Sequence, residues 1–343
     1  MASPRSAVPQ DEPCLQVPHR RFGSTDLMVP HLSYENGTGL IATESAPWQS
    51  GLAPVRRCRV RYSSYARWSR WSDHHRVGVE DGVGAGPCLG ARFVGLHGGP
   101  EAVGVGHVVD AAVQSVGVCV AVRAGLGVVG ISLLLVHDVE FAPTIDVILQ
   151  ETLPALETLR QAGITRYIGI TGYPLQTLRE VIERSPVKIN VVLSYCRGTL
   201  FDQALLEYIP FFQSLGLGVA NAAPLGMGLL TRGPPPSWHP ATDQLKDACA
   251  RAYAFCQACT ESGVSLEKLG LGYSLYKFSG VHTTIVGMNS CDTLRENIDC
   301  IRVTKDEKTT AELLQRKFFQ PLATRHWEGR ELEKVSRKLA QQQ

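Results

Sequence analysis

The sequence of 343 residues has no lysine before position 188, although nine lysines follow from there to the end. It also lacks any uninterrupted apolar run of the roughly 18 to 20 residues that a membrane-spanning helix needs. The first residues contain no apolar stretch typical of a secretion signal. We therefore expect a cytoplasmic protein with no membrane partner. Its two halves differ in composition.

An excess of charge of one sign is also missing. Thirty-four basic residues face 32 acidic ones, so we expect no nucleic acid partner. The ten cysteines are few for a chain of this length and are expected to be reduced thiols. Cys256 and Cys259 form a CxxC pair without a second pair, which favours core packing over zinc binding. Asp73, His74 and His75 have no evident partner cluster either, so no metal site is predicted.

The segment 41–130 has an unusual composition. Residues 38–130 contain nine arginines but only six acids, and residues 81–130 contain 13 glycines. The valines of this stretch would suit strands, yet its glycines weaken strands and helices alike. No capped amphipathic helix can be found between residues 40 and 115. We expect this segment to be aberrant or disordered.

From residue 131 onward, short apolar runs alternate with amphipathic helices. This alternation is typical of βαβ units around a parallel sheet that is buried on both faces. The expected strands are 131–138, 164–171, 190–195, 217–222 and 283–288. The expected helices are 145–163, 175–185, 203–214, two or more within 242–278, and 291–301. Residues 1–19 are expected to be a disordered tail, and 302–343 a charged helical tail outside the sheet.

Several motifs in this second half follow one another in a familiar order. They are LLLVHDVEF (133–141), GITRYIGITGYPL (163–175), NVVLSYCRGTL (190–200), VANAAPLGMGLLT (219–231) and TIVGMNSCDTLRENI (284–298). Together they resemble the aldo-keto reductase superfamily, most closely its L-galactose dehydrogenase branch, which includes D-arabinose and L-fucose dehydrogenases. The resemblance implies a (β/α)8 TIM barrel over 20–301, in which 41–130 is not family-like. The five expected strands would be its fourth to eighth, and residues 33–130 would have to supply the first three.

The resemblance also implies an activity. Members transfer a hydride between a nicotinamide dinucleotide and a carbonyl, an alcohol or a sugar hemiacetal. In this branch the substrate would be L-galactose or a related aldose, oxidised to its lactone in metabolism of the ascorbate type. The family uses a tyrosine, a lysine, an aspartate and a histidine, and only the histidine, His137, is identified here. His137 would orient a substrate oxygen at the end of its strand, although a purely structural histidine is the alternative.

The resemblance assigns the cofactor to the ends of later strands. Thr171 and Gly172 would hold the nicotinamide carboxamide, although a hydroxyl there can also cap a helix. The turn after the next-to-last strand would wrap the pyrophosphate through Ala223, Leu225 and Gly226, with an ordinary loop as the alternative. The adenosine half would lie against Gly287, Asn289, Glu296 and Asn297.

NAD is the expected cofactor, because Gly287 and Thr293 stand where members that prefer NADP present Lys or Arg to the 2′-phosphate. Arg295 keeps NADP possible. Trp238, His239 and Pro240 also match the sugar dehydrogenases, and they could either brace a loop or touch the substrate. We expect a small-molecule aldose as the partner, and a monomer or weak dimer.

The missing lysine has two explanations. The chain could be a degenerate relative that keeps the cofactor half, or its first half could be read in a shifted frame. A one-base shift over residues 90–102 permits a lysine motif, and the same shift over 56–64 permits an aspartate motif, whereas the tyrosine is not recovered. In either case we expect negligible dehydrogenase activity from the chain as it stands. The alternative function is a non-catalytic protein that binds a nucleotide or a partner chain.

Overall fold

The computed structural model describes residues 18–35, 118–122, 131–259, 264–288 and 290–333. Within these ranges, seven strands form one sheet in the order β3-β9-β8-β7-β6-β5-β4, and β1 and β2 form a separate hairpin. The strands are β1 (His19–Arg21), β2 (Met28–Pro30), β3 (Leu32–Glu35), β4 (Val118–Val122), β5 (Ile131–Val136), β6 (Thr165–Gly172), β7 (Val191–Tyr195), β8 (Gly218–Ala222) and β9 (Thr283–Gly287).

Helices follow the strands from β5 onward. They are α2 (Ile145–Val147), α3 (Leu153–Gln161), α4 (Leu175–Arg184), α5 (Leu205–Ser214), α6 (Asp243–Cys259), α7 (Leu266–Lys277), α8 (Cys291–Asp299) and α9 (Lys305–Leu314). Four short turns of helix are η1 (Val139–Phe141), η2 (Ile148–Thr152), η3 (Gly226–Gly228) and η4 (Gln315–Phe319). The five expected strands and the expected helices are confirmed, and their ends lie within two residues of those expected.

Six of the seven sheet strands run parallel. β5, β6, β7, β8 and β9 pair in sequence, and β3 then pairs in parallel with β9, so that Leu32 lies opposite Thr284. The early strand β3 is thus a neighbour of the late strand β9. A closed barrel makes this pairing when its first strand meets its last.

Strand β4 differs from a barrel's third strand, because it pairs antiparallel with β5. Only eight residues, 123–130, join the two strands. A parallel crossover needs a dozen or more residues, so a connection of this length permits only a hairpin-like pairing. The expectation that 33–130 supplies three barrel strands is therefore not met at β4. Residues 36–117, including Asp73, His74 and His75, lie outside the described residues.

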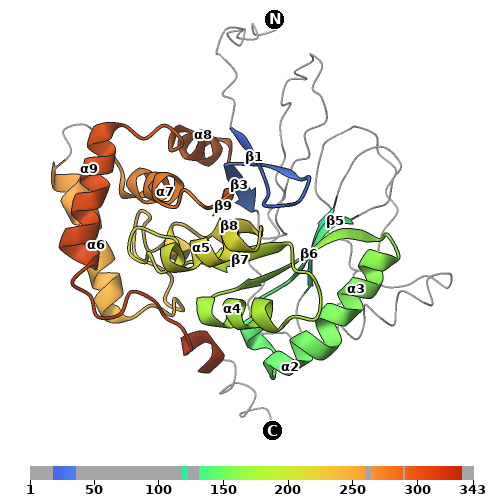
Figure 1. The fold of residues 1–343 in the computed structure, drawn as a ribbon. Helices are drawn as coiled ribbons and strands as arrows, with labels where there is room; N and C mark the ends of the chain where they lie inside the picture. The colour runs from blue at the N-terminus through green and yellow to red at the C-terminus, as the bar shows by residue number, and fades with distance from the viewer. Residues whose placement is uncertain (1–17, 36–117, 123–130, 260–263, 289, 334–343) are drawn as a thin grey trace, which may run out of the picture.

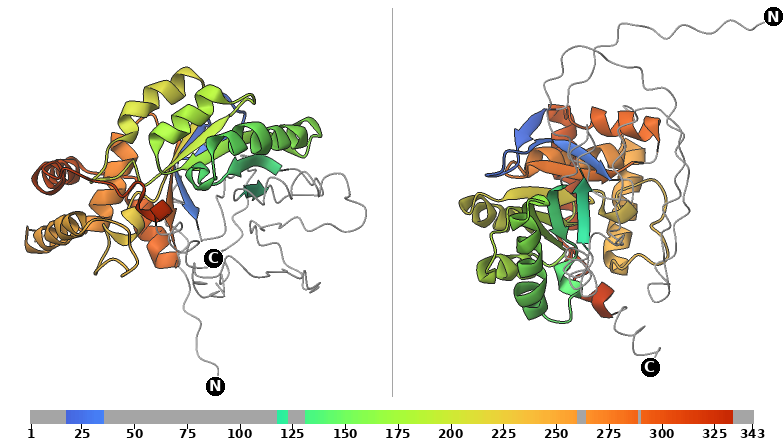
Figure 2. Two further views of the ribbon diagram at one scale, coloured as in Figure 1. Left: turned by 90° about the horizontal axis from the view of Figure 1, so that it is seen from below. Right: turned by 90° about the vertical axis from the view of Figure 1, so that its right-hand side faces the viewer.

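Side chains alternate between the two faces of the sheet, as they must along a strand. The outer face carries Leu134, Val136, Ile168, Val192 and Val219, which pack into the largest apolar cluster together with the helices. Figure 1 shows α4 and α5 in front of the strands, and Figure 2 shows the arrangement from two further directions. The inner face forms a second cluster from Leu133, Leu135, Val191, Ala220, Ala222 and Ile285.

The β1–β2 hairpin packs against the amino ends of the strands. Phe22 is fully buried in the inner cluster, and its ring lies against Gly218 at the start of β8. Ser24 donates its N–H to the carbonyl of Gly216 at 2.8 Å. Asp26, between β1 and β2, accepts a hydrogen bond from the hydroxyl of Tyr167 on β6 at 2.7 Å. The hairpin therefore covers the end of the sheet opposite to the carboxyl ends of its strands.

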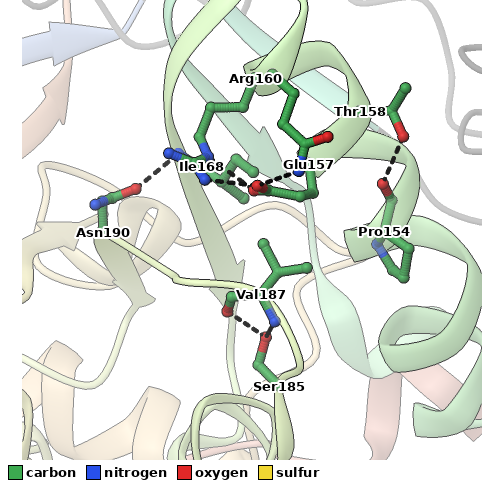
Figure 3. Close-up of polar contacts among 9 residues, drawn as sticks. Pro154, Glu157, Thr158, Arg160, Ile168, Ser185, Val187 and Asn190 are labelled. Atoms are coloured by element: carbon green, nitrogen blue, oxygen red, sulfur yellow. Dashed lines mark hydrogen bonds and ion pairs between the residues drawn. The ribbon is translucent and has the colours of Figure 1, made fainter.

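Polar contacts also tie the amino ends of β6 and β7 together (Figure 3). The buried Asn190 accepts a hydrogen bond from the backbone N–H of Ile168 at 3.2 Å, through its side-chain oxygen. On α3, Glu157 pairs with Arg160 at 2.5 Å, while the Thr158 hydroxyl donates to the carbonyl of Pro154. The bond of Asn190 therefore joins the start of β7 to β6, whereas the other two contacts lie within α3.

The charged segment after α8 folds onto the helices. α9 begins with a capping box in which Thr304 and Glu307 bond each other's backbone N–H groups. Farther on, Trp327 is 1% exposed and belongs to the outer apolar cluster. In the part of the chain that is described, no helix has the length and apolar character needed to cross a membrane.

Candidate functional site

The predicted site residues gather at the carboxyl ends of the parallel strands. His137 directly follows β5, Thr171 and Gly172 end β6, Ala223 follows β8, and Gly287 ends β9. The strands that carry them are consecutive neighbours, with β7 lying between β6 and β8. The structure therefore brings these five residues to a single edge of the sheet, where parallel α/β folds place their ligands.

His137 is held by its neighbour Asp138. Its Nδ1 lies 2.9 Å from Asp138 Oδ2, with the side chains 42% and 28% exposed. The backbone N–H of Asp138 donates to Thr171 Oγ1 at 2.8 Å, and the same hydroxyl lies 3.4 Å from Asp138 Oδ1. Residue 137 continues the alternation that turns Leu133 and Leu135 to the inner face of the sheet. Its imidazole therefore lies on the inner side, at the carboxyl end of β5. Thr171, which is 1% exposed, thus contacts the Asp138 turn.

Gly172 has a packing reason for being glycine. A Cβ at this position would lie 2.8 Å from Oε2 of Glu140, a carboxylate of η1. Glu140 Oε1 accepts the backbone N–H of Tyr173 at 2.9 Å. Burial, together with the nearby charge of Asp138, raises the pKa of Glu140 to about 7. A second bond thus ties the turn after β5 to the end of β6, next to a titratable acid.

The turn after β8 has an unusual backbone. Ala223 and Gly226 adopt left-handed conformations with φ of 53° and 60°. A Cβ on Gly226 would lie 2.6 Å from the ring of Phe201. Packing against Phe201 is therefore enough to require a glycine there, without any contact to a cofactor. Leu225 joins an apolar cluster with Met288 and Cys300. The turn is therefore packed against the region that follows β9.

The proposed adenosine region lies on α8. Asn297 is 7% exposed, and its Nδ2 has no hydrogen-bond partner among the described residues. Glu296 and Gly287 are exposed, whereas Asn289 lies outside the described residues. Arg295 pairs with Asp292 at 3.0 Å, an exposed contact within the helix. Asn297 thus carries a buried amide nitrogen without a partner among the described residues, while Arg295 is engaged with an acid.

A buried set of residues that sequence reasoning missed lies beside these strand ends. Tyr173 stacks on Trp327 with ring centroids 5.2 Å apart and meets Tyr195 edge-on at 6.0 Å. Arg197 pairs with Asp202 at 2.9 Å and with Glu328. Burial raises the pKa of Tyr195 well above its usual range. Residues 327–331, which we call the strap, therefore lie against the ends of β6 and β7.

The Trp-His-Pro motif braces this region. His239 is 2% exposed, accepts the N–H of Ala241 at its Nδ1, and places its Nε2 3.0 Å from the carbonyl of Gly226. Its ring meets Trp327 edge-on at 5.0 Å. Of the two roles considered for this motif, bracing is the one that the contacts of His239 support.

Cys256 is 1% exposed within α6, as expected for core packing. In the described ranges, no group of three or more His, Cys, Asp and Glu side chains is placed to hold a metal ion.

The profile of the Aldo/keto reductase family matches residues 119–315. Among curated proteins, the chain is 39% identical over 202 residues to an L-galactose dehydrogenase of Arabidopsis thaliana, with 57% of this chain and 61% of that protein covered. It is 26% identical over 213 residues to a D-arabinose 1-dehydrogenase of Saccharomyces cerevisiae, with 57% and 62% covered. The chain thus spans about three fifths of the length of these relatives.

Solved structures give a similar coverage. An aldo-keto reductase of Bacillus halodurans, in its holo form, is 24% identical to the chain. The match covers 54% of this chain and 59% of that one, with a TM-score of 0.40.

Proposed function

This chain belongs to the aldo/keto reductase family of (β/α)8-barrel oxidoreductases, and from that premise we propose that it is by descent an NAD-dependent sugar dehydrogenase. Its substrate would be L-galactose or a related aldose, oxidised at the anomeric carbon to a lactone. The proposal is supported by the similarity to L-galactose and D-arabinose dehydrogenases. The observation that carries it is the gathering of His137, Thr171, Ala223 and Gly287 at one edge of the sheet.

These residues would hold a dinucleotide as follows. The partnerless amide of Asn297 would donate to a ring nitrogen of adenine, with Glu296 beside it on α8. The loop containing Ala223, Leu225 and Gly226 would lie along the pyrophosphate. Thr171 and Gly172 would border the nicotinamide, whose role when bound is to accept a hydride from the sugar. None of the residues named for this side of the site comes from the segment 36–117.

NAD is favoured over NADP by the charges near α8. The 2′-phosphate of NADP is usually paired by a Lys or Arg side chain. The one arginine of α8, Arg295, lies 3.0 Å from Asp292, and this carboxylate would oppose a second anion. Thr293 is bonded to Ser290 at 2.8 Å and carries no charge.

The residues for proton transfer are less complete than those for nucleotide binding. His137 would orient the anomeric hydroxyl, but no lysine precedes residue 188, so the family lysine cannot come from the first half. Loss of the group that moves the proton commonly lowers the rate by about 10² to 10⁴. We propose that the chain retains nucleotide binding and turns over weakly at most.

Titration calorimetry of the full chain with NAD+ and NADP+ tests the cofactor proposal. We expect tighter binding of NAD+, and about tenfold weaker binding by Asn297→Ala, since one hydrogen bond is lost. Asp299→Asn, an exposed change on the same helix, is the matched control. Binding of neither nucleotide would overturn the proposal, and tighter binding of NADP+ would overturn the cofactor preference. Turnover of L-galactose as fast as that of typical dehydrogenases would contradict the weak activity.

A further inference from the structure

Glu140 places its carboxyl group directly against the end of β6. Its Oε1 accepts the backbone N–H of Tyr173 at 2.9 Å, and its Oε2 lies 2.8 Å from the position that a Cβ on Gly172 would occupy. Oε2 is buried and has no hydrogen-bond partner among the described residues. Because Gly172 has no side chain, only the backbone of β6 would separate this oxygen from a ligand bound at Thr171.

The groups that surround Glu140 do not compensate a negative charge on it. The charged side chains that act on it are Asp138, on the same turn, and Glu331, on the strap, and both are acids. On the side of α4, the apolar Leu178 meets the same spot beside Gly172. Burial, helped by the charge of Asp138, raises the pKa of Glu140 to about 7. At neutral pH the carboxyl group is therefore close to the midpoint of its titration.

Other ionisable side chains near this strand end are engaged elsewhere. Burial raises the pKa of Tyr173 far above its usual range, so this hydroxyl is neutral. Arg197 lies over the Tyr173 ring, 5.3 Å from its centroid, and pairs with two acids of its own. His137 lies 2.9 Å from Asp138. These potential cations each contact an acid other than Glu140, so a positive charge on a ligand would be a new partner for it.

We propose that Glu140 makes this site discriminate between the two states of the cofactor, because its carboxylate attracts the cationic nicotinamide of NAD+ and not the neutral ring of NADH. This inference rests on the proposed function, because it needs a nicotinamide beside Thr171 and Gly172. The two rings differ by one positive charge, and an opposite charge close by favours the ionised carboxyl. NAD+ should therefore displace part of a proton from Glu140 when it binds near neutral pH, and NADH should displace less.

The sign of the pH dependence follows from this attraction. At a pH well below the pKa of Glu140 the carboxyl is neutral, and the charge of the nicotinamide makes no difference to it. As pH rises and the carboxylate forms, the affinity for NAD+ should increase relative to that for NADH. A site that oxidises a sugar starts with NAD+ and ends with NADH, so this preference holds the starting cofactor and favours release of the product.

Titration calorimetry of the full chain with NAD+ and with NADH tests the proposal without turnover. Runs in buffers of different ionisation enthalpy, between about pH 6 and 8, count the protons released on binding. We expect a fractional release with NAD+ and less with NADH, and an affinity ratio of NAD+ to NADH that rises about three- to tenfold over this range. Glu140→Gln should abolish both effects, whereas Glu183→Gln, at an exposed acid of α4, should retain them.

The possible results separate this inference from a structural role and from the proposed function. If Glu140 only ties the turn to Tyr173, its substitution should weaken NAD+ and NADH alike and leave their ratio unchanged. That result, or the same pH dependence for both cofactors in the unsubstituted chain, would overturn the inference while the proposed function stands. Binding of neither cofactor would overturn the proposed function and this inference together.

Discussion

The backbone N–H of Trp327 donates to the phenolic oxygen of Tyr173 at 2.8 Å, although 154 residues separate the two in sequence. Both residues are buried, and their rings stack on each other. Burial raises the pKa of Tyr173 far above its usual range, so its hydroxyl stays neutral throughout the ordinary pH range. This bond and the ring stacking together hold the strap against the end of β6.

Removal of that hydroxyl should loosen the strap. In Tyr173→Phe the Trp327 N–H loses its partner in a buried place, so we expect a loss of about 1–3 kcal/mol in the free energy of unfolding. Urea denaturation followed by tryptophan fluorescence measures it. Tyr208→Phe is the control, because the Tyr208 hydroxyl makes a 3.3 Å bond to Gln176 at an exposed place. Equal effects of the two variants would show that the Tyr173 bond does not matter.

Glu140 should make stability depend on pH. Its pKa is about 7 in the folded protein, raised first by burial, and near 4.5 when unfolded. Between these values the folded state binds more protons than the unfolded state, so stability should fall as pH rises from about 4.5 to 7, by about 2–3 kcal/mol. Denaturation midpoints in Glu140→Gln should lose this slope, whereas the exposed Glu183→Gln should retain it. A slope that survives in Glu140→Gln would assign it to another group.

Arg197 should be among the most sensitive charged positions. Its side chain is 8% exposed and pairs with Asp202, whose pKa is already raised by burial. Arg197→Met leaves that carboxylate buried without its cation, so we expect a loss of about 3–5 kcal/mol in the free energy of unfolding. Arg295→Met breaks an exposed pair and should cost less than about 0.5 kcal/mol. Chemical denaturation of both variants checks the difference, and a small effect at Arg197 would contradict the burial of this pair.

Two glycines that both have a positive φ angle should respond differently to substitution by alanine. Gly163 has φ of 73° and open space around its Cβ position, so Gly163→Ala should cost only the backbone strain, about 1 kcal/mol. Gly226 has φ of 60° and faces Phe201 at 2.6 Å, so Gly226→Ala should cost about 2–4 kcal/mol. Thermal unfolding of the two variants compares them directly. A Gly226→Ala variant as stable as Gly163→Ala would mean that the Phe201 ring moves aside freely.

The sequence predicted the second half of the fold because its signals are local. The apolar run at β5 and the amphipathic pattern of α4 each depend on neighbouring residues, so strand and helix could be placed without tertiary information. The position of His137 followed from the same logic, since a residue after a buried strand lies at the carboxyl edge.

Tertiary features were beyond that reasoning. The stacking of Trp327 on Tyr173 joins distant parts of the chain, and a tryptophan in a charged segment gave little warning of it. The contact of Asp138 with His137 depends on a left-handed turn. Asp adopts this conformation more often than most residues, but its presence in a sequence does not locate such a turn. The reversal of β4 follows from the short connection to β5, a length that could have been weighed from the sequence once β4 was recognised.

The pairing of β3 with β9 has a consequence for folding during synthesis. Residues 32–35 leave the ribosome early, but their partners at 284–287 are made only after about 250 further residues. At typical synthesis rates of about 5–20 residues per second, this edge waits roughly 12 to 50 seconds for its neighbour. Contacts so distant in sequence form slowly, and unpaired strand edges invite misassembly in the meantime. The nascent chain should therefore depend on chaperones until β9 has emerged.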